Sequence, residues 1–417
     1  MNWSTQAIRD ASRTGDYGRV VRLARLDARV SQKQLGEACG LSQSAVSRLE
    51  AHGTGSYDMT VLARAATHLH IPPRLLGLAD HLASLPVLDG DVERRNFLAT
   101  GAVIAAVPVF GSSTPGSHAT DGQAATLRTA TTAFRRLDGT TPSRHLIEPV
   151  LAHLRLTQKL ASEAADDQHR GRLAAAGSEA ASLAGWLSWD MGDHGSARTW
   201  YGSAITAARR SSDRLLAAYQ LGSLAQLEAH VGNAPQSLAL VRSARQQLGS
   251  ERPAIADAWL LTIEALAHAS AHAAPAADRA LRAAWDAAAS IHSEEPPPWP
   301  WVFAFNESKV AACRLSCGAR LGLHEWVFSA QDAAAAALSS GHDKQRAQLV
   351  LDIAFGHLAA GRLDGAFTLG MRALETGLRY RSGRTVERAR ALRRAYTSPT
   401  PPRVVRDFDE RLHGVYM

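Results

Sequence analysis

The sequence predicts an all-α protein in two parts, an N-terminal helix-turn-helix domain and a longer array of repeated helix pairs behind it. Capping residues in the first 80 positions bracket short segments with apolar residues at helical spacing, the first over 17–26. Further along, small and apolar residues recur with a period of about 40 residues, which is typical of stacked helix pairs. Most of the 417 residues therefore belong to the repeats.

Two capped helices follow each other closely in the first part. Ser31 is placed to cap a helix over 32–39, and Gly40 ends it because glycine adopts the left-handed conformation at least cost. Ser42 is placed to cap the next helix, over 43–50. Two helices joined by a short turn that contains glycine predict a helix-turn-helix motif.

Apolar, glycine and acidic positions keep one register across five expected helices. They are Ser31-Gln32, Leu35, Gly40-Leu41-Ser42, Val46-Ser47, Leu49-Glu50, Leu62, Ala66, Leu69 and Ile71-Pro72. This pattern resembles the lambda-repressor-like XRE family of DNA-binding domains. The resemblance implies a five-helix domain over 1–82 that binds a double-stranded DNA operator as a homodimer. Glu50 is expected to have a structural role.

The second helix of such a motif lies in the major groove, which selects candidate DNA-binding residues. Gln43 and Ser44 lie at its start, where Gln forms paired hydrogen bonds with adenine and Ser hydrogen-bonds to any of several bases. Ser47 and Arg48 lie one turn further on, and for these, base contacts, phosphate contacts and an exposed salt bridge all stay open. The resemblance implies that Gln32, at the start of the preceding helix, holds a phosphate.

Residues 83–122 interrupt the helical pattern with Pro, Gly, Ser and Thr and predict a flexible linker. Within it, Arg94-Arg95 precedes an apolar stretch over 97–110, and these residues resemble a twin-arginine export signal. The stretch is shorter than the roughly 20 residues that cross a bilayer, and it lies far from the N-terminus. We therefore expect an apolar helix or tether in a cytoplasmic protein that does not engage a membrane.

Residues 123–417 predict the repeats. Small, apolar and small residues recur at offsets of 5, 9 and 12 from Gly192, Gly232, His272 and Gly361, with a weaker copy at Gly322. These offsets resemble the tetratricopeptide repeat, although the unit is longer than that family's 34 residues. The resemblance implies an α-solenoid, with one or two capping helices over 123–175.

The family's inward-facing offsets select candidate ligand-binding residues on the first helix of each pair. They are Glu179, Trp186, Trp189, Tyr219, Gln226, Trp259, Lys309, Gln348 and Phe355. Aromatic and polar groups in one groove suit an extended peptide or a small molecule, whereas packing between helices is the alternative for the tryptophans. Residues 294–301, with four prolines and two tryptophans, predict stiff backbone that forms either a lid on the groove or a rigid spacer.

The net charge of +7 lies mostly near the C-terminus, because residues 371–406 carry a net +8 and residues 1–80 only +3. The C-terminal arginines Arg388, Arg390, Arg393 and Arg394 suit DNA phosphates, a partner subunit or a solvated face, and the sequence leaves these open. DNA binding is therefore predicted from the motif and not from the overall charge.

Several kinds of chemistry are excluded. None of the four lysines follows glycine, so a phosphate-binding P-loop is absent, and no S-x-x-K or G-x-S-x-G nucleophile motif occurs. Three cysteines without a C-x-x-C motif indicate a reducing compartment, and Cys313 and Cys317 are expected to be a buried apolar pair and not metal ligands. We expect no enzyme activity, no cofactor and no metal.

The two parts together resemble the regulators of actinobacteria and the quorum-sensing regulators of Gram-positive bacteria that join an XRE domain to a tetratricopeptide sensor. We therefore expect a sequence-specific transcriptional regulator whose repeat domain senses a peptide or small-molecule signal and mediates dimerisation. The alternative is a protein-interaction scaffold tethered to DNA, without a small ligand. The effector, the operator sequence and the direction of regulation are not predicted.

Overall fold

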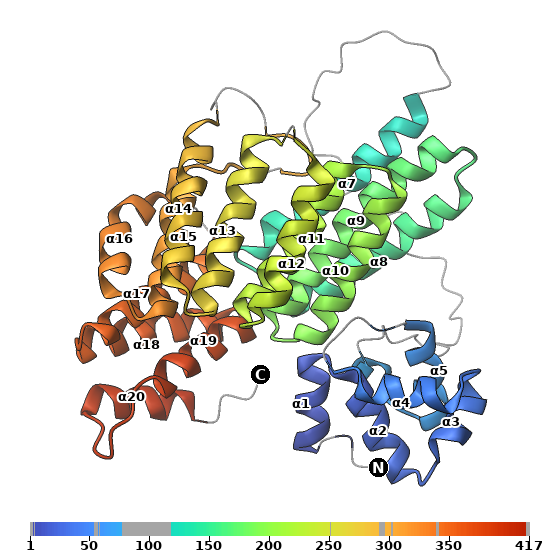
Figure 1. Cartoon of the computed structure of the whole chain (residues 1–417), viewed down its shortest axis with the longest axis horizontal. Coiled ribbons are helices and arrows are strands. Elements are labelled where there is room, and N and C mark those ends of the chain that lie inside the picture. The colour runs from blue at the N-terminus through green and yellow to red at the C-terminus, as the bar shows by residue number, and fades with distance from the viewer. Residues whose placement is uncertain are drawn as a thin grey trace, which may run out of the picture.

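The computed structural model describes residues 5–53, 59–76, 118–250, 252–291, 297–301, 303–338 and 342–413, together with Trp3 and Tyr57 (Figure 1). All regular structure in these ranges is helical, so the predicted fold class is confirmed. The N-terminal domain contains α1 (Gln6–Thr14), α2 (Tyr17–Asp27), α3 (Gln32–Cys39), α4 (Gln43–Ala51), α5 (Met59–Leu69) and the 3-10 helix η1 (Pro73–Leu76).

The helices α3 and α4 begin where the sequence predicts, because local capping fixes them. The Ser31 hydroxyl accepts the backbone N–H of Gln34, whose side chain accepts the backbone N–H of Ser31 in return. Gly40 ends α3 with a φ of 68°. The Ser42 hydroxyl accepts the N–H of Ala45 and starts α4. Helix α1 is an addition that the sequence analysis did not predict.

The repeat domain consists of helix pairs preceded by two single helices. Its elements are α7 (His118–Asp138), α8 (Ser143–Glu163), α9 (Asp167–Asp190), α10 (His194–Arg210), α11 (Arg214–His230), α12 (Ala234–Leu248), α13 (Ala254–Ser270), α14 (Ala274–Ala289), α15 (Glu307–Leu321), α16 (His324–Leu338), α17 (Asp343–Ala359), α18 (Leu363–Arg379), α19 (Gly383–Arg394) and α20 (Arg403–Leu412). The predicted capping helices are α7 and α8, which pack on α9.

The repeat register is confirmed at the turn inside each pair. All five anchor residues have a positive φ: 84° at Gly192, 86° at Gly232, 56° at His272, 71° at Gly322 and 73° at Gly361. Glycine adopts this conformation without a steric penalty, which explains its recurrence. The weaker copy at Gly322 is therefore a true repeat, formed by α15 and α16.

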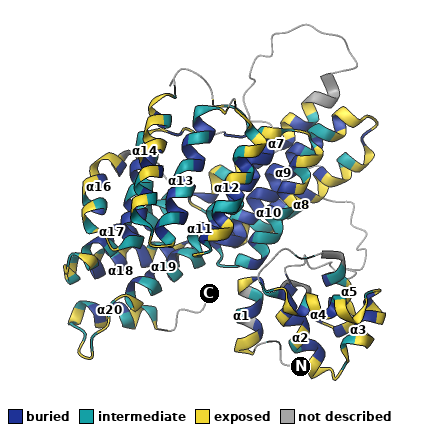
Figure 2. Ribbon diagram, in the orientation of Figure 1, coloured by how far each residue is buried: buried dark blue, intermediate teal, exposed yellow. Residues whose placement is uncertain are grey.

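The helix pairs form two layers. Helices α9, α11, α13, α15, α17 and α19, which we call the inner layer, contact one another in succession, and each of the first five packs on the helix that follows it in the chain. Helix α19 also contacts α9, so the inner layer closes on itself. Figure 2 shows buried residues concentrated along the inner-layer helices, whereas their outer partners expose one face.

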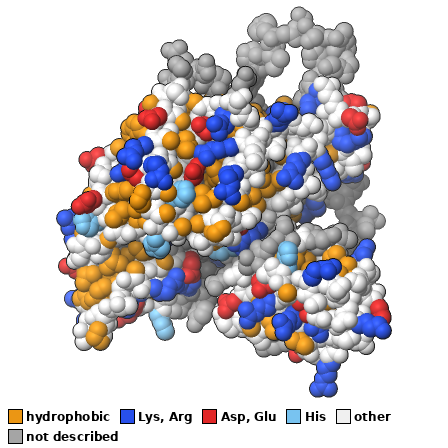
Figure 3. Space-filling model, in the orientation of Figure 1, with side chains coloured by type: hydrophobic (Ala, Val, Ile, Leu, Met, Phe, Trp, Pro, Cys, Tyr) orange, Lys and Arg blue, Asp and Glu red, His pale blue; other side chains and the backbone are white. Residues whose placement is uncertain are grey.

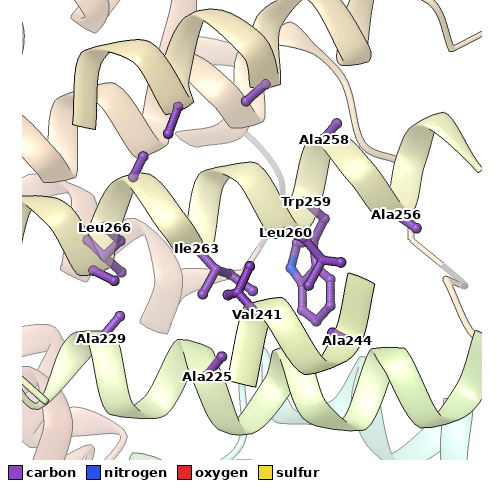
Figure 4. Close-up of a cluster of buried hydrophobic side chains, with 14 of the residues drawn as sticks. Ala225, Ala229, Val241, Ala244, Ala256, Ala258, Trp259, Leu260, Ile263 and Leu266 are labelled. Carbon is purple, nitrogen blue, oxygen red and sulfur yellow. The ribbon is translucent and has the colours of Figure 1, made fainter. Parts of the chain in front are cut away.

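Small residues allow the layers to approach closely. Figure 4 shows Trp259 and Ile263 of α13 pointing toward Ala225 of α11 and toward Val241 and Ala244 of α12. Ala225 and Ala244 are fully buried, so a larger side chain at either position would push the helices apart.

A buried ionic network joins the two ends of the repeat domain. The Lys344 ammonium, at the start of α17, donates to Asp138 of α7, to the Ser143 hydroxyl at 2.9 Å and to Asp190 of α9 at 3.0 Å. The Ser382 hydroxyl, which precedes α19, donates to Asp190 at 2.7 Å. Lys344 and both carboxylates are at most 2% exposed. The network therefore fixes the closure of the inner layer.

Most of the predicted linker, including the apolar segment over 97–110, lies outside the described residues. Helix α7 begins at His118, so its first turn falls inside the range assigned to the linker. None of the helices in the described ranges combines the length and the hydropathy needed to cross a membrane.

Candidate functional site

One surface of α4 presents four of the five predicted DNA-binding residues. Gln43, Ser44, Ser47 and Arg48 are all exposed, and their spacing places them side by side on one face of the helix. On the other side of α4, Glu50 is only 7% exposed. The helix therefore has a polar face free to meet a groove and a buried face that holds it to the domain.

The fifth residue, Gln32, is half-buried in the first turn of α3. Its Nε2 donates to Glu50 Oε2 at 2.8 Å, and Arg25 donates to the same carboxylate from Nε at 2.5 Å and Nη2 at 2.9 Å. Burial acts to raise the pKa of Glu50, but the hydrogen bonds from Arg25 and Gln32 outweigh it and lower the pKa. Glu50 thus joins α2, α3 and α4, in agreement with its expected structural role, whereas the phosphate contact of Gln32 stays a prediction.

Basic side chains do not gather in one patch on the face of the N-terminal domain that Figure 3 shows. Figure 3 shows acidic and basic side chains interspersed there, in agreement with the net +3 of residues 1–80. Lys33, which the sequence analysis did not single out, is exposed in the first turn of α3 next to Gln32. Helix N-termini attract phosphates, so its position beside Gln32 was the signal that could have identified it.

All nine predicted ligand-binding residues lie on inner-layer helices. Glu179, Trp186 and Trp189 belong to α9, Tyr219 and Gln226 to α11, Trp259 to α13, Lys309 to α15, and Gln348 and Phe355 to α17. The register thus places them on the layer that the resemblance implied. Their contacts gather most of them into two groups, described below, and their ligand role stays a prediction.

The first group, which we call the tyrosine cluster, consists of Tyr219, Trp259, Trp301, Glu179 and Arg135. The rings of Tyr219 and Trp259 stack with centroids 5.3 Å apart, and Trp301 packs edge-on against them at 5.2 and 5.5 Å. Trp301 is fully buried. The segment predicted as a lid or spacer therefore covers these inner-layer rings with its described part, residues 297–301.

Helix α7 supplies the positive charge of the tyrosine cluster. Arg135 donates to Tyr219 Oη at 3.0 Å, and its Nη2 lies 3.1 Å from Glu179 Oε2. Burial raises the pKa of Glu179, and Arg135 offsets this only in part. Tyr219, Trp259 and Glu179 are all less than 9% exposed and contact one another or Arg135 within the chain.

The second group surrounds the two remaining tryptophans. Trp186 and Trp189 meet edge to face at 5.2 Å, and the guanidinium of Arg384 lies over both rings at 4.6 and 4.8 Å. Trp186 Nε1 donates to Asp138 Oδ2 at 2.7 Å, while Trp189 packs against the His230 ring at 4.9 Å. Trp189 is buried and Trp186 is half-buried, so packing accounts for much of both side chains.

Phe355 and Gln348 of α17 face α19. The guanidinium of Arg388 lies over the Phe355 ring at 4.1 Å, and Gln348 Nε2 donates to Thr385 Oγ1 at 2.8 Å. Arg384, Arg388 and Arg320, which we call the arginine cluster, are not among the predicted ligand-binding residues, and Arg388 was singled out only as one of the C-terminal arginines. The repeat offsets carry no signal for Arg384 and Arg388, because α19 lies beyond the last predicted copy, and Arg320 of α15 is not at one of the inward-facing offsets.

The remaining two predicted residues, Gln226 and Lys309, are half-buried. The backbone carbonyl of Gln226 accepts a hydrogen bond from the His230 ring at 2.9 Å. Burial lowers the pKa of Lys309.

The C-terminal arginines are largely paired within the chain. Arg388 lies 2.5 Å from Asp352, and Arg393 lies 2.5 Å from Asp409. Glu387 pairs with both Arg390 and Arg394. The net charge of +8 over 371–406 is therefore not a uniformly solvated face.

An open groove of about 1440 Å³ lies between the two domains. Tyr17 and Tyr57 line it from the N-terminal domain, and residues of α8, α9 and α10, among them Thr157, Gly177 and Thr206, line it from the repeat domain. The groove lies on a different side of α9 from the predicted ligand residues, none of which lines it.

The two domains meet at the start of α10. Arg198 Nη1 donates to the backbone carbonyl of Thr14 at 2.6 Å, and its Nε lies 2.6 Å from Glu228 Oε1. At Gly195, a Cβ atom would lie 2.5 Å from the Tyr17 hydroxyl, so only glycine fits this approach. Burial raises the pKa of Tyr17, which is 2% exposed.

The cysteines of α15 lie side by side. The Sγ atoms of Cys313 and Cys317 are 3.9 Å apart, and Cys317 is buried whereas Cys313 is half-buried. Across the ranges that the structure describes, His, Cys, Asp and Glu side chains form no group of three that could hold a metal ion.

Comparisons with known proteins identify the N-terminal domain. Residues 16–78 match the family model of a helix-turn-helix domain. The chain is similar in structure to a Rap protein complexed with competence and sporulation factor, with 12% identity over 69% of this chain and 87% of that chain and a TM-score of 0.44. It is also similar to Bacillus thuringiensis PlcR in complex with the peptide PapR7 and DNA, with 15% identity over 84% and 99% of the two chains and a TM-score of 0.35. No curated protein matches the sequence. The family match shows that the N-terminal domain is a helix-turn-helix domain, and the helix pairs of the structure itself show the repeat solenoid that follows it.

Proposed function

We propose that the chain is a sequence-specific DNA-binding transcriptional regulator that acts by binding and not by catalysis. The observation that carries the proposal is the exposed polar face of α4 in a matched helix-turn-helix domain. In this motif the start of the second helix enters the major groove. Gln43 then reaches an adenine, Ser44 serves several bases, and Arg48 reaches a guanine or a phosphate.

The proposed complex is a homodimer on two half-sites. Gln32 and Lys33, in the first turn of α3, suit the phosphates that flank the groove. Two copies of α4 related by a two-fold axis read half-sites about 34–36 Å apart, one turn of DNA. The operator is therefore expected to be a near-palindrome.

A selected operator tests the reading helix. Gln43→Ala is expected to cost about 1–3 kcal/mol of binding free energy and to relax the preference at one base position. Gln247→Ala is the matched control, because Gln247 is exposed on α12, away from the helix-turn-helix. Equal operator affinities of the wild type and Gln43→Ala in a fluorescence titration would contradict the assignment of α4.

We propose further that the repeat domain senses a peptide or a small molecule and transmits its state to the DNA-binding domain. The α9–α10 turn and the start of α10 contact both α19 of the repeat domain and the DNA-binding domain. At the α9–α10 turn, Gly192 lies next to Gly383 of α19, and three residues on, Gly195 lies against Gly15 and Tyr17. We assume two arrangements of the inner layer, which differ in this contact. An effector shifts the balance between them only if it binds one arrangement more tightly than the other.

The contact at Gly195 provides the test of transmission. Gly195→Val places a side chain where Tyr17 and Ser12 lie and is expected to separate the domains. Gly202→Val is the matched control, because it makes the same change on the same helix at a position where a Cβ meets nothing within 4 Å. Small-angle scattering should show a larger radius of gyration for Gly195→Val alone. Identical scattering of the two variants would contradict the docking.

The second candidate function is a protein-interaction scaffold addressed to DNA. It is favoured by the burial of Tyr219 and Trp259 under Trp301, which covers part of the predicted ligand groove. Operator affinity measured with and without a cell extract separates the two. A shift that survives protease digestion of the extract supports a small molecule, and a shift that digestion removes supports a peptide or protein. No shift with any extract favours the scaffold.

A further inference from the structure

Three arginines converge at one end of the inner layer. Arg320 lies in the last turn of α15, and Arg384 and Arg388 lie in the first half of α19. Burial and the charge of all three arginines hold the pKa of His230, at the end of α11, well below its usual value. The three guanidinium groups of the arginine cluster therefore act on one region, between α11, α15 and α19.

Two members of the arginine cluster are held in place. Arg384 lies over Trp186 and Trp189, with its Nε 3.9 Å from Asp190 Oδ1. Arg388 lies over Phe355 and pairs with Asp352 at 2.5 Å. Aromatic faces fix the planes of these guanidinium groups and leave part of their hydrogen-bonding edges for another acceptor.

The third member lacks a partner. Within the described part of the chain, Arg320 makes no hydrogen bond and no ion pair, and its Nε is buried without an acceptor. The nearest acid in electrostatic terms, Asp352, is already engaged by Arg388 at 2.5 Å and by the Ser316 hydroxyl at 2.6 Å. Burial and the charge of Arg388 lower the pKa of Arg320 to about 10, which Asp352 offsets only in part.

The charges around this region do not balance. Lys344 faces Asp138 and Asp190, and Arg384 shares Asp190 with it. Asp352 forms an ion pair with Arg388. One positive charge, on Arg320, is left over. An unpaired charge is costly where water is largely excluded, and the C-terminal dipole of α15 does not supply the acceptor that the buried Nε lacks.

We propose that Arg320, flanked by Arg384 and Arg388, binds the carboxylate of the effector. This inference rests on the proposed sensing role and names its ligand chemistry. A carboxylate supplies the single negative charge and the planar pair of acceptors that one guanidinium lacks. The neighbouring rings of Phe355 and Trp186 are half-buried, so a ligand with an apolar group next to its carboxylate suits the site. A phosphate would bring more negative charge than the one surplus cation balances.

Such a ligand would join two helices that are not neighbours in the inner layer, since α17 lies between them. Arg320 belongs to α15, whereas Arg384 and Arg388 belong to α19, whose N-terminus contacts the α9–α10 turn through Gly383. Binding between α15 and α19 would therefore act on the closure of the inner layer, which lies next to the contact with the DNA-binding domain.

Titration calorimetry on the full-length chain tests the ligand class. The probes are N-acetyl-leucine, its neutral amide N-acetyl-leucinamide, and inorganic phosphate. We expect the wild type to bind the acid, and the affinity to fall about tenfold or more for the amide and for Arg320→Met. Arg320→Lys should retain part of the affinity. Arg282→Met is the matched control, because Arg282 is exposed on α14 and pairs with Asp278.

Several results would overturn the proposal: no binding of the acid, equal binding of acid and amide, unchanged binding by Arg320→Met, or preferred binding of phosphate. The melting temperature of the ligand-free variant is a second measurement. Removing an unpaired charge should leave it unchanged or raised, whereas a clear decrease or failure to fold would show that Arg320 is structural and would also overturn the proposal.

The operator assay separates this inference from the proposed function. If a cell extract shifts the operator affinity of Arg320→Met as it does that of the wild type, sensing stands and the carboxylate site fails. If N-acetyl-leucine binds at Arg320 but no ligand changes operator affinity, the site stands and the sensing role fails.

Discussion

The inner layer contains two clusters of arginine and aromatic side chains that differ in their partners. In the tyrosine cluster, Arg135 donates to Tyr219 and pairs with Glu179, and Trp301 covers the rings. In the arginine cluster, Arg320 has no hydrogen bond or ion pair among the described residues, although its neighbours Arg384 and Arg388 contact aromatic rings and acids. The chain supplies Arg135 with an anion and a hydrogen-bond acceptor, and within the described residues it supplies Arg320 with neither.

This difference separates structural from functional use of the same residues. A buried cation that meets its anion and its hydrogen bonds contributes to a fixed arrangement, and removing one partner is expensive. A cation left without its anion costs free energy in the absence of a ligand, and such a cost is what a ligand can relieve. The tyrosine cluster is therefore expected to respond to mutation by losing stability, and the arginine cluster by losing binding.

The largest loss is expected from Trp301→Ala, which removes the cover of the tyrosine cluster. Truncating a fully buried tryptophan typically costs about 3–5 kcal/mol of unfolding free energy. Trp285→Ala is the control, because Trp285 on α14 is 44% exposed and its truncation should change stability by only about 0.5 kcal/mol. Urea unfolding measures both, and similar values for the two would show that the 297–301 segment does not hold the cluster.

Arg135→Met should cost about 3 kcal/mol near pH 7, because it leaves the Glu179 carboxylate buried without its cation. Burial already raises the pKa of Glu179 in the folded state, and loss of Arg135 raises it further. The folded state then binds a proton more tightly than the unfolded state, so the deficit against wild type should shrink as the pH falls from about 7 to about 5.

Unfolding free energies at both pH values check this sign. The double variant Arg135→Met/Glu179→Gln should recover part of the loss and remove its pH dependence, since the buried charge is gone. A deficit that grows as the pH falls would contradict the pairing of Arg135 with Glu179.

In the arginine cluster, Asp352→Asn should increase binding of N-acetyl-leucine about tenfold, equivalent to about 1.4 kcal/mol. The change frees Arg388 from its carboxylate partner and leaves a second unmatched cation next to Arg320. Asp364→Asn on α18, away from the arginine cluster, is the control. Weaker binding by Asp352→Asn in calorimetry would show that Asp352 supports the site and does not compete with the ligand.

The smallest effect is expected from Arg384→Met, which removes a guanidinium from the rings of Trp186 and Trp189. A partly buried contact of this kind is worth about 0.5–2 kcal/mol. Arg362→Met is the control, because Arg362 is exposed and lies over the Phe328 ring at 5.1 Å. Stability should fall less in the control, and a loss above that of Trp301→Ala would reverse the ranking of the two clusters.

Features set by local chemistry could be predicted from the sequence. Ser31 and Ser42 fix the starts of α3 and α4 through hydrogen bonds to residues three positions away, and the repeat period fixes the turns at Gly192 and Gly361. The face of α4 with Gln43 and Arg48 follows from helical spacing alone.

Features that depend on distant residues could not be predicted. Lys344 meets Asp138 across 206 positions, and no periodicity relates a capping helix to the fourth clear repeat. Trp301 left a lid and a spacer equally open, because its partner rings belong to two earlier repeats. Arg388 was grouped with its sequence neighbours, whereas its partner Asp352 lies on another helix.

The most direct test of the contrast between the two clusters is the unfolding free energy of Arg135→Met and of Arg320→Met, measured side by side near pH 7 without ligand. Both changes remove one guanidinium from the inside of the repeat domain. The structure predicts a loss of about 3 kcal/mol for Arg135→Met and no loss, or a gain, for Arg320→Met. Equal losses for the two variants would contradict the account, because Arg320 would then be as well partnered as Arg135.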